Sequence, residues 1–104
     1  MIGYTINHVE IEGTQTSPET FTTNSGKLEF NYSTTPFPAI DLGTYIVSIV
    51  ANGAPYQDCK INQVGTTSQA GSNITFQLAV SDAGNPSGDG KYYADISILM
   101  QEMT

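Results

Sequence analysis

The sequence predicts an all-β fold, either a small antiparallel β-sandwich of about six strands or a jelly-roll-like variant of it. Ten Ile and five Val stand against four Leu, and β-branched side chains fit a pleated strand better than a helix. Apolar and polar residues alternate with a period of two in several segments, whereas no segment shows a helical period. The length of 104 residues suits a single domain, which we place at residues 1–104.

The N-terminal segment, residues 2–11, alternates but changes phase along its length. Its apolar residues lie on even positions up to Ile6 and on odd positions from Val9 onward. One extra residue in a strand moves all later side chains to the opposite face. We therefore predict a β-bulge near Asn7 and His8.

Two roles are open to this N-terminal segment. It is either the first strand of its own sandwich or part of an N-terminal arm and loop at residues 1–26, which includes the neutral Ser/Thr-rich loop at residues 13–26. An arm would pair with an edge strand of a neighbouring protein. In that case, deletion of residues 1–12 leaves the sandwich folded.

In three later segments, apolar and polar residues alternate without interruption, which predicts half-buried antiparallel strands. These segments are KLEFNYS, NITFQLAV and the last strand, which begins at Tyr92. A shorter strand is predicted within residues 56–64. Pro36 and Pro38 argue against regular strand pairing at residues 33–43. The apolar residues expected to face inward in the three clean strands are Leu28, Phe30 and Tyr32; Ile74, Phe76, Leu78 and Val80; and Tyr92, Ala94, Ile96, Ile98 and Met100.

One segment, TYIVSIVA, is apolar on both faces. Tyr45, Val47 and Ile49 lie on one face of the expected strand, and Ile46 and Val50 lie on the other. Such a strand is either central in a sheet and covered on both sides, or its second face meets another chain.

The charge balance excludes several kinds of partner. Ten Asp and Glu residues face three Lys and no Arg, which gives a net charge of −7. Nucleic-acid binding and adsorption to an anionic membrane both need clustered basic residues. The N-terminus lacks the features of a signal peptide, and no run reaches the roughly 18 apolar residues that span a bilayer. We therefore expect a protein made in the cytoplasm whose partner is a protein, with no nucleic acid and no membrane.

No residue pattern predicts catalysis or a bound metal. The single Cys59 is expected to lie with Ile61 on an inward face, where a free Cys acts as a small apolar side chain, and nothing near it or the single His8 indicates an oxyanion hole. The glycine-rich loop at residues 81–91 includes the oxygen-bearing Asp82, but it lacks the spacing of a Ca²⁺ loop. We expect no enzyme, no metal and no cofactor.

Tyrosines at predicted strand ends raise a sugar-binding alternative. Tyr56, Tyr92 and Tyr93 lie beside polar loops, where aromatic faces can stack on a saccharide and neutral polar groups can hydrogen-bond to it. Half-buried tyrosines with solvated hydroxyls are also ordinary at strand ends, so the pattern has a purely structural explanation as well.

Two resemblances bear on these expectations. Residues 35–101 resemble the H-type lectins through PFPAIDLGTYIVSIV, CKINQVGTTSQAGSNITFQLAV and YYADISILMQ. That family implies a six-stranded antiparallel sandwich that forms trimers, often at phage tail-fibre tips. The family's usual Trp near the last strand is missing, with Tyr93 in that neighbourhood, so no binding residues are carried over. The whole chain resembles small bacteriophage decoration, or cement, proteins in size and in its Thr, Ser, Ala and Gly content, which implies a place on the virion surface.

From these observations we expect a non-enzymatic structural protein of a phage particle. It would be a capsid decoration or cement protein that stabilises contacts between major capsid subunits and associates with copies of itself as a dimer or trimer. The alternative is a carbohydrate-binding, lectin-like module of a tail fibre or receptor-binding protein. The residues expected at the protein interface are apolar ones that a small core does not need: Ile2, Tyr4, Ile6, Phe21, Phe37, Ile46 and Val50.

Overall fold

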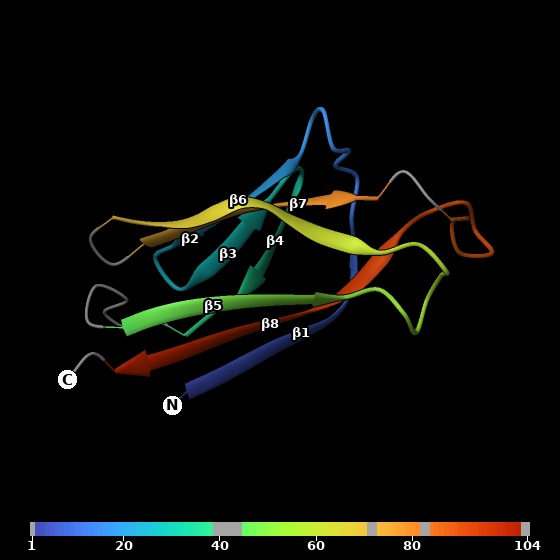
Figure 1. The fold of residues 1–104 in the computed structure, drawn as a ribbon. Coiled ribbons are helices and arrows are strands. Elements are labelled where there is room, and N and C mark those ends of the chain that lie inside the picture. The colour runs from blue at the N-terminus through green and yellow to red at the C-terminus, as the bar shows by residue number, and fades with distance from the viewer. Residues whose placement is uncertain (1, 39–44, 71–72, 82–83, 103–104) are drawn as a thin grey trace.

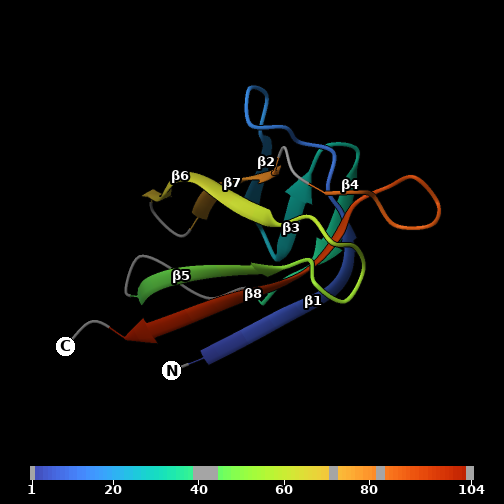
Figure 2. The same ribbon diagram turned by 45° about the vertical axis from the view of Figure 1, so that its right-hand side comes forward.

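The computed structural model describes residues 2–38, 45–70, 73–81 and 84–102, and in these residues the chain forms eight β-strands and no helix (Figures 1 and 2). The strands are β1 Ile2–Glu10, β2 Glu19–Asn24, β3 Lys27–Phe30, β4 Ser33–Pro36, β5 Tyr45–Asn52, β6 Ile61–Ala70, β7 Asn73–Val80 and β8 Tyr93–Glu102. They form a three-stranded sheet of order β1-β8-β5, here sheet A, and a five-stranded sheet of order β4-β3-β2-β7-β6, here sheet B. All the strand pairs are antiparallel, so the predicted small β-sandwich is confirmed, with eight strands instead of six.

A ladder of phenylalanine rings lies on the inner face of sheet B. Phe21 on β2 pairs across the strands with Phe30 and Phe76, and its ring stacks on theirs at centroid distances of 4.9 and 5.1 Å. Phe37 follows β4 and meets the ring of Tyr4 edge-on at 5.2 Å, which joins the two sheets. Phe21 and Phe37 are only 0% and 5% exposed. They are core residues, and the expectation that the core does not need them is wrong.

The bulge predicted in the N-terminal segment is present in β1. Ile6 pairs with Ile96 and Val9 pairs with Ala94, so the register shifts between Ile6 and Val9. At the shift, His8 adopts a positive φ of 58°. Because β1 pairs with β8 on both sides of this bulge, the segment is a strand of sheet A within its own chain, the first of the two roles open to it.

The prediction of a loop at residues 13–26 is wrong, because β2 lies within it. The inward-facing side chains of β2 are Glu19, Phe21 and Thr23, and two of these are polar. An alternation of apolar and polar residues is therefore absent although the strand is present. The structure also contains β4 in the segment where the prolines argued against strand pairing. β4 is an edge strand that ends at Pro36, so the N–H group that proline lacks removes no hydrogen bond from the interior of the sheet.

Tyr32 is the exception among the apolar residues expected to face inward in the three clean strands. Its side chain is 97% exposed, because β3 ends at Phe30 and Asn31 adopts a positive φ of 40°, which turns the chain. The predictions for residues 33–43, for TYIVSIVA and for the loop at residues 81–91 fall partly on residues 39–44 and 82–83, which lie outside the described residues, as do residues 71–72.

β5 is an edge strand of sheet A, so the idea that TYIVSIVA is central and covered on both sides is wrong. Tyr45, Val47 and Ile49 pack against the core, as the alternation predicted. Ile46 and Val50 on the opposite face are 54% and 52% exposed. The second apolar face of this strand is therefore open in the single chain.

Candidate functional site

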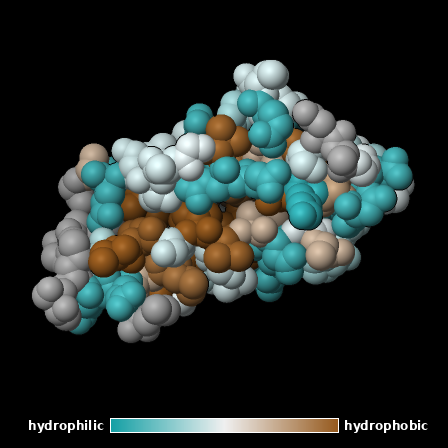
Figure 3. Space-filling model, in the orientation of Figure 1, coloured by the Kyte–Doolittle hydropathy of each residue, from teal (hydrophilic) through white to brown (hydrophobic). Residues whose placement is uncertain are grey.

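The outer face of sheet A carries a flat and uncharged surface. Strand pairing places Gly3 and Ser48 on either side of Leu99, and Thr5 and Val50 on either side of Ser97. Ile46 and Gln101 form the next row toward the end of β8. We call this surface the outer patch, formed by Gly3, Thr5, Ile46, Ser48, Val50, Ser97, Leu99 and Gln101. Figure 3 shows hydrophobic surface gathered along β5, below the more polar surface over β6.

The outer patch is small compared with a protein interface. One residue on a sheet face covers about 30 Å² of the sheet plane, because strands lie about 4.8 Å apart, rise about 3.3 Å per residue, and turn only every second side chain to a given face. The patch therefore spans about 250 Å², whereas a stable pairwise interface covers about 800 Å² on each partner. One such contact is too small to hold two proteins together by itself, and many copies would have to act together.

The structure divides the residues that were predicted at an interface. Ile46 and Val50 lie together in the outer patch, whereas Phe21 and Phe37 are buried in the core. Tyr4 and Ile6 are half-buried on the inner side of β1 and pack against the core. Ile2 is 41% exposed and pairs with the buried Met100, so it lies at the end of the inner face. Only two of the seven predicted residues thus share an exposed surface; the sequence analysis missed Leu99.

At the opposite end of the same sheet, three aromatic side chains meet in what we call the aromatic cluster: His8, Tyr56 and Tyr93. The imidazole of His8 stacks on the ring of Tyr93 at a centroid distance of 4.1 Å and an angle of 19°. The ring of Tyr56 lies 5.1 Å from that of His8 and 6.1 Å from that of Tyr93. Two of the three predicted sugar-binding tyrosines are therefore brought together. Tyr92 is not among them, because it packs against the core and lines an open cavity with Glu10 and Lys91.

Asp95 anchors one side of the aromatic cluster. Its Oδ1 atom accepts the backbone N–H of His8 at 3.0 Å and also accepts the hydroxyl of Tyr56. The hydrogen bond to Asp95 raises the pKa of Tyr56, because losing the proton would break the bond and place two negative charges together. Asp95 thus holds both the bulge and one of the rings in place.

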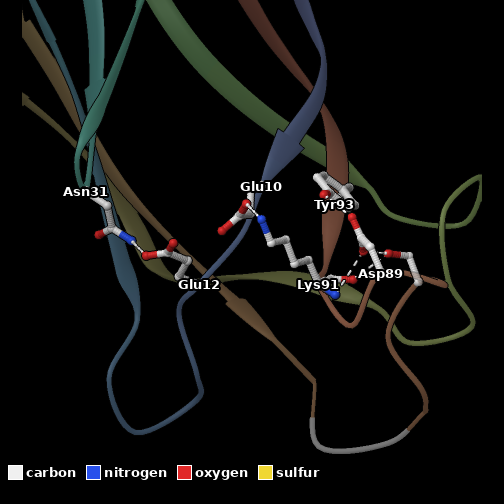
Figure 4. Close-up of polar contacts among 7 residues, drawn as sticks. Glu10, Glu12, Asn31, Asp89, Lys91 and Tyr93 are labelled. Carbon is white, nitrogen blue, oxygen red and sulfur yellow. Dashed lines mark hydrogen bonds and ion pairs between the residues drawn. The ribbon is translucent and has the colours of Figure 1, made fainter.

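Asp89 anchors the other side of the cluster. Its carboxylate accepts the hydroxyls of Ser87 and Tyr93 and the backbone N–H of Lys91 (Figure 4). The Ser87 bond first and the Tyr93 bond second lower the pKa of Asp89 to about 2, and the same carboxylate raises the pKa of Tyr93 to about 12. The phenol of Tyr93 therefore stays a hydrogen-bond donor to Asp89 across the physiological pH range.

Further polar contacts tie the loops near the cluster to the strands. The Nζ atom of Lys91 lies 3.4 Å from Oε1 of Glu10, and the amide of Asn31 donates to Oε2 of Glu12 at 2.8 Å (Figure 4). An exposed ion pair such as Lys91–Glu10 contributes about 0–1 kcal/mol to stability. The Lys91–Glu10 contact ties the loop that carries Asp89 to β1, and the Asn31–Glu12 contact ties the turn after β3 to the connection after β1.

Glu19 is a buried carboxylate with a structural role. It is 3% exposed, and its Oε1 atom accepts the backbone N–H of Glu12 at 2.7 Å. Burial raises the pKa of Glu19, because the charged form loses solvation. The connection from β1 packs so closely here that a Cβ on Gly13 would lie 2.3 Å from the backbone nitrogen of Glu19. Glu19 and Gly13 together fix the path of the chain from sheet A to sheet B.

His8 and Cys59 take up environments that do not resemble a nucleophile and its base. Cys59 is 3% exposed, and burial raises the pKa of its thiol, which disfavours the reactive thiolate. His8 is committed to the stack on Tyr93. In the described ranges, no three His, Cys, Asp or Glu side chains are placed to hold a metal ion; Asp82 of the glycine-rich loop lies outside those ranges.

The described part of the chain also contains no helix long and apolar enough to cross a bilayer. Comparison with protein-family models, with curated proteins and with solved structures finds no match to this chain. The resemblances to H-type lectins and to phage decoration proteins therefore rest on the residues and composition given for them above.

Proposed function

We propose that this protein is a non-enzymatic adhesive protein that binds other proteins through the outer patch, as a decoration or cement protein on a bacteriophage capsid. The observation that carries the proposal is the exposure of Ile46 and Val50, at 54% and 52%, on the open face of an edge strand. The phage setting comes from the resemblance in size and composition to decoration proteins.

The chemistry of the outer patch favours a protein partner. The chain carries a net charge of −7, yet the residues of the patch are all uncharged. A partner can therefore cover it without removing a charge from water, which is the costly part of most polar contacts. Ile46 and Val50 are each about half exposed, so covering one of them contributes about 1 kcal/mol.

The size of the patch favours a partner that presents many equal sites. An interface much smaller than about 800 Å² per partner is weak, but a symmetric shell offers repeated sites, and linked contacts multiply into a strong total affinity. Major capsid subunits and further copies of this chain are the proposed partners.

Binding to phage particles tests the proposal. Purified chain is added to capsids of the phage that encodes it, prepared without this protein, and the bound copies are counted after sedimentation. We expect saturation at a fixed number of copies per capsid. Ile46→Lys should reduce occupancy at least tenfold, because it places a charge in the apolar contact.

Thr20→Lys is the matched control. Thr20 is exposed on the outer face of sheet B, so the substitution adds the same charge away from the patch. Occupancy should be unchanged. Absence of saturable binding by the wild type, or equal loss in the two variants, would contradict the proposal.

A further inference from the structure

We propose that the aromatic cluster is a binding site for a neutral saccharide, separate from the outer patch and independent of the proposed adhesive function. A sugar ring would lie against the open face of His8, and its hydroxyl groups would hydrogen-bond to the ring nitrogens of His8 and to Asp95.

The stacking geometry creates a flat platform. One face of the His8 ring is covered by Tyr93 at 4.1 Å, and Tyr56 supports the same ring from the side at 5.1 Å. His8 is exposed whereas the two tyrosines are half-buried, so the remaining open ring surface belongs to His8. The C–H groups of a pyranose ring can pack on such a surface.

Hydrogen-bonding groups around this platform are left open. In the part of the chain that the structure describes, neither ring nitrogen of His8 has a hydrogen-bond partner. Oδ1 of Asp95 accepts two hydrogen bonds there, whereas Oδ2 accepts none. A neutral imidazole offers one donor and one acceptor, and a carboxylate oxygen offers an acceptor. Neighbouring sugar hydroxyls, which both donate and accept, complement this set.

The backbone conformation of His8 suits its place in the bulge. His8 has a φ of 58°, in the left-handed region where Asn, Asp and His are the most frequent residues after Gly. The hydrogen bond from its N–H to Asp95 and the stack on Tyr93 hold it there.

A neutral sugar fits the cluster better than a charged ligand. A cation prefers the face of a phenol or indole ring, and one face of Tyr93 is covered by His8, which leaves less phenol surface for a cation. Anions such as phosphates are disfavoured because Asp89 and Asp95 flank the site and the chain carries a net charge of −7. A neutral pyranose has neither difficulty.

The test is an NMR titration of the full ¹⁵N-labelled chain with glucose, galactose and N-acetylglucosamine in turn. Concentrations reach about 20 mM, because a small exposed site gives dissociation constants near the millimolar range. For at least one sugar we expect saturable shifts confined to the amides of His8, Tyr56, Tyr93 and Asp95 and of their neighbours in the chain. No saturable shift at the cluster with any of the three would overturn the proposal.

Three variants sharpen the test. His8→Asn suits the left-handed backbone but removes the ring, and His8→Phe keeps the stack but removes the ring nitrogens. Both should weaken binding at least tenfold, and His8→Phe decides alone if His8→Asn does not fold. The control is Tyr32→Ala, which removes a 97% exposed tyrosine outside the cluster and should leave binding unchanged. Binding that survives both His8 variants, or is lost equally in the control, would overturn the proposal.

Discussion

The outer faces of the two sheets are both rich in hydroxyl and amide side chains, but they differ in how these side chains are paired. On sheet B, the hydroxyls of Thr22 and Thr75 lie 3.3 Å apart across neighbouring strands, and the amide of Gln77 donates to Thr20 at 3.2 Å. These side chains use one another as hydrogen-bond partners. The Thr-rich composition thus gives sheet B an outer face whose side chains hydrogen-bond to one another as well as being solvated.

The outer face of sheet A has one such pair of hydroxyl side chains, but apolar side chains lie beside it. Thr5 and Ser97 lie 3.2 Å apart on this face, but the residue on the other side of Ser97 is Val50, and Ile46 follows on the same strand. No element among the described residues covers these two apolar side chains, which are 54% and 52% exposed. The comparison teaches that hydroxyl-bearing side chains occur on both faces, whereas the exposed apolar side chains Ile46 and Val50 of β5 distinguish the outer face of sheet A.

Deletion of residues 1–12 gives the largest expected effect on this arrangement. It removes β1 from sheet A, together with Val9 and Ile11, which are 5% and 2% exposed, and leaves β8 with one neighbour. We expect loss of the cooperative thermal transition measured by circular dichroism. A retained cooperative transition would contradict the structural role of β1 and restore the arm interpretation.

Phe21→Ala is expected to be the most damaging single substitution in sheet B. It removes the central ring of the ladder between Phe30 and Phe76 and should lower the free energy of unfolding by about 3–5 kcal/mol. Ile46→Ala in the outer patch should cost less than about 1 kcal/mol, because that side chain is already half solvated. Urea denaturation of the two variants measures the difference, and equal losses would contradict the division between core and patch.

Much of the fold follows from local sequence. The change of phase between Ile6 and Val9 predicts the bulge, because the side-chain period of a strand is two. β2 could not be found in the same way, since Glu19 and Thr23 occupy inward positions where apolar residues are expected. The inward position predicted for Tyr32 was wrong, because the alternation of apolar and polar residues continues through Asn31 although the chain turns there.

The candidate sites follow from the sequence only in part. The two apolar faces of β5 indicate that its second face is exposed or covered by a partner, but only the strand order makes β5 an edge. Tyr56 and Tyr93 could be proposed from their positions beside polar loops. Their meeting with His8 could not be foreseen, because pairing of β1 with β8 brings together residues far apart in the chain. The bulge at His8 is the one local signal that could have singled out that residue.

The buried carboxylate of Glu19 should give sheet B a distinctive pH dependence. Its pKa is raised above the ordinary value of 4.5, so the folded state binds the proton more tightly than the unfolded state. The contribution of Glu19 to stability therefore rises as the pH falls from 7 and is complete below the ordinary value. Wild-type stability should increase over this range relative to Glu19→Gln, measured by urea denaturation at each pH. Parallel pH profiles would contradict this account.

Substitution of Ile46 and Val50 by Thr should have the smallest effect on stability. It gives the outer face of sheet A the hydroxyl character of sheet B, and each substitution at these exposed positions should change the free energy of unfolding by about 0.5 kcal/mol or less. Thermal unfolding of the double variant measures this. A large loss of stability would show that the two side chains serve the fold of the single chain.

A competition experiment with the same double variant tests the central claim most directly. Equal amounts of wild-type and Ile46→Thr/Val50→Thr chains are mixed with limiting capsids, and the bound ratio is measured by mass spectrometry. Two half-exposed apolar side chains contribute about 2 kcal/mol together, so the wild type should be enriched more than tenfold. Val64→Thr, at a partly exposed position of sheet B, is the control and should compete equally with the wild type. Equal binding of the double variant would contradict the claim that the outer patch is the adhesive surface.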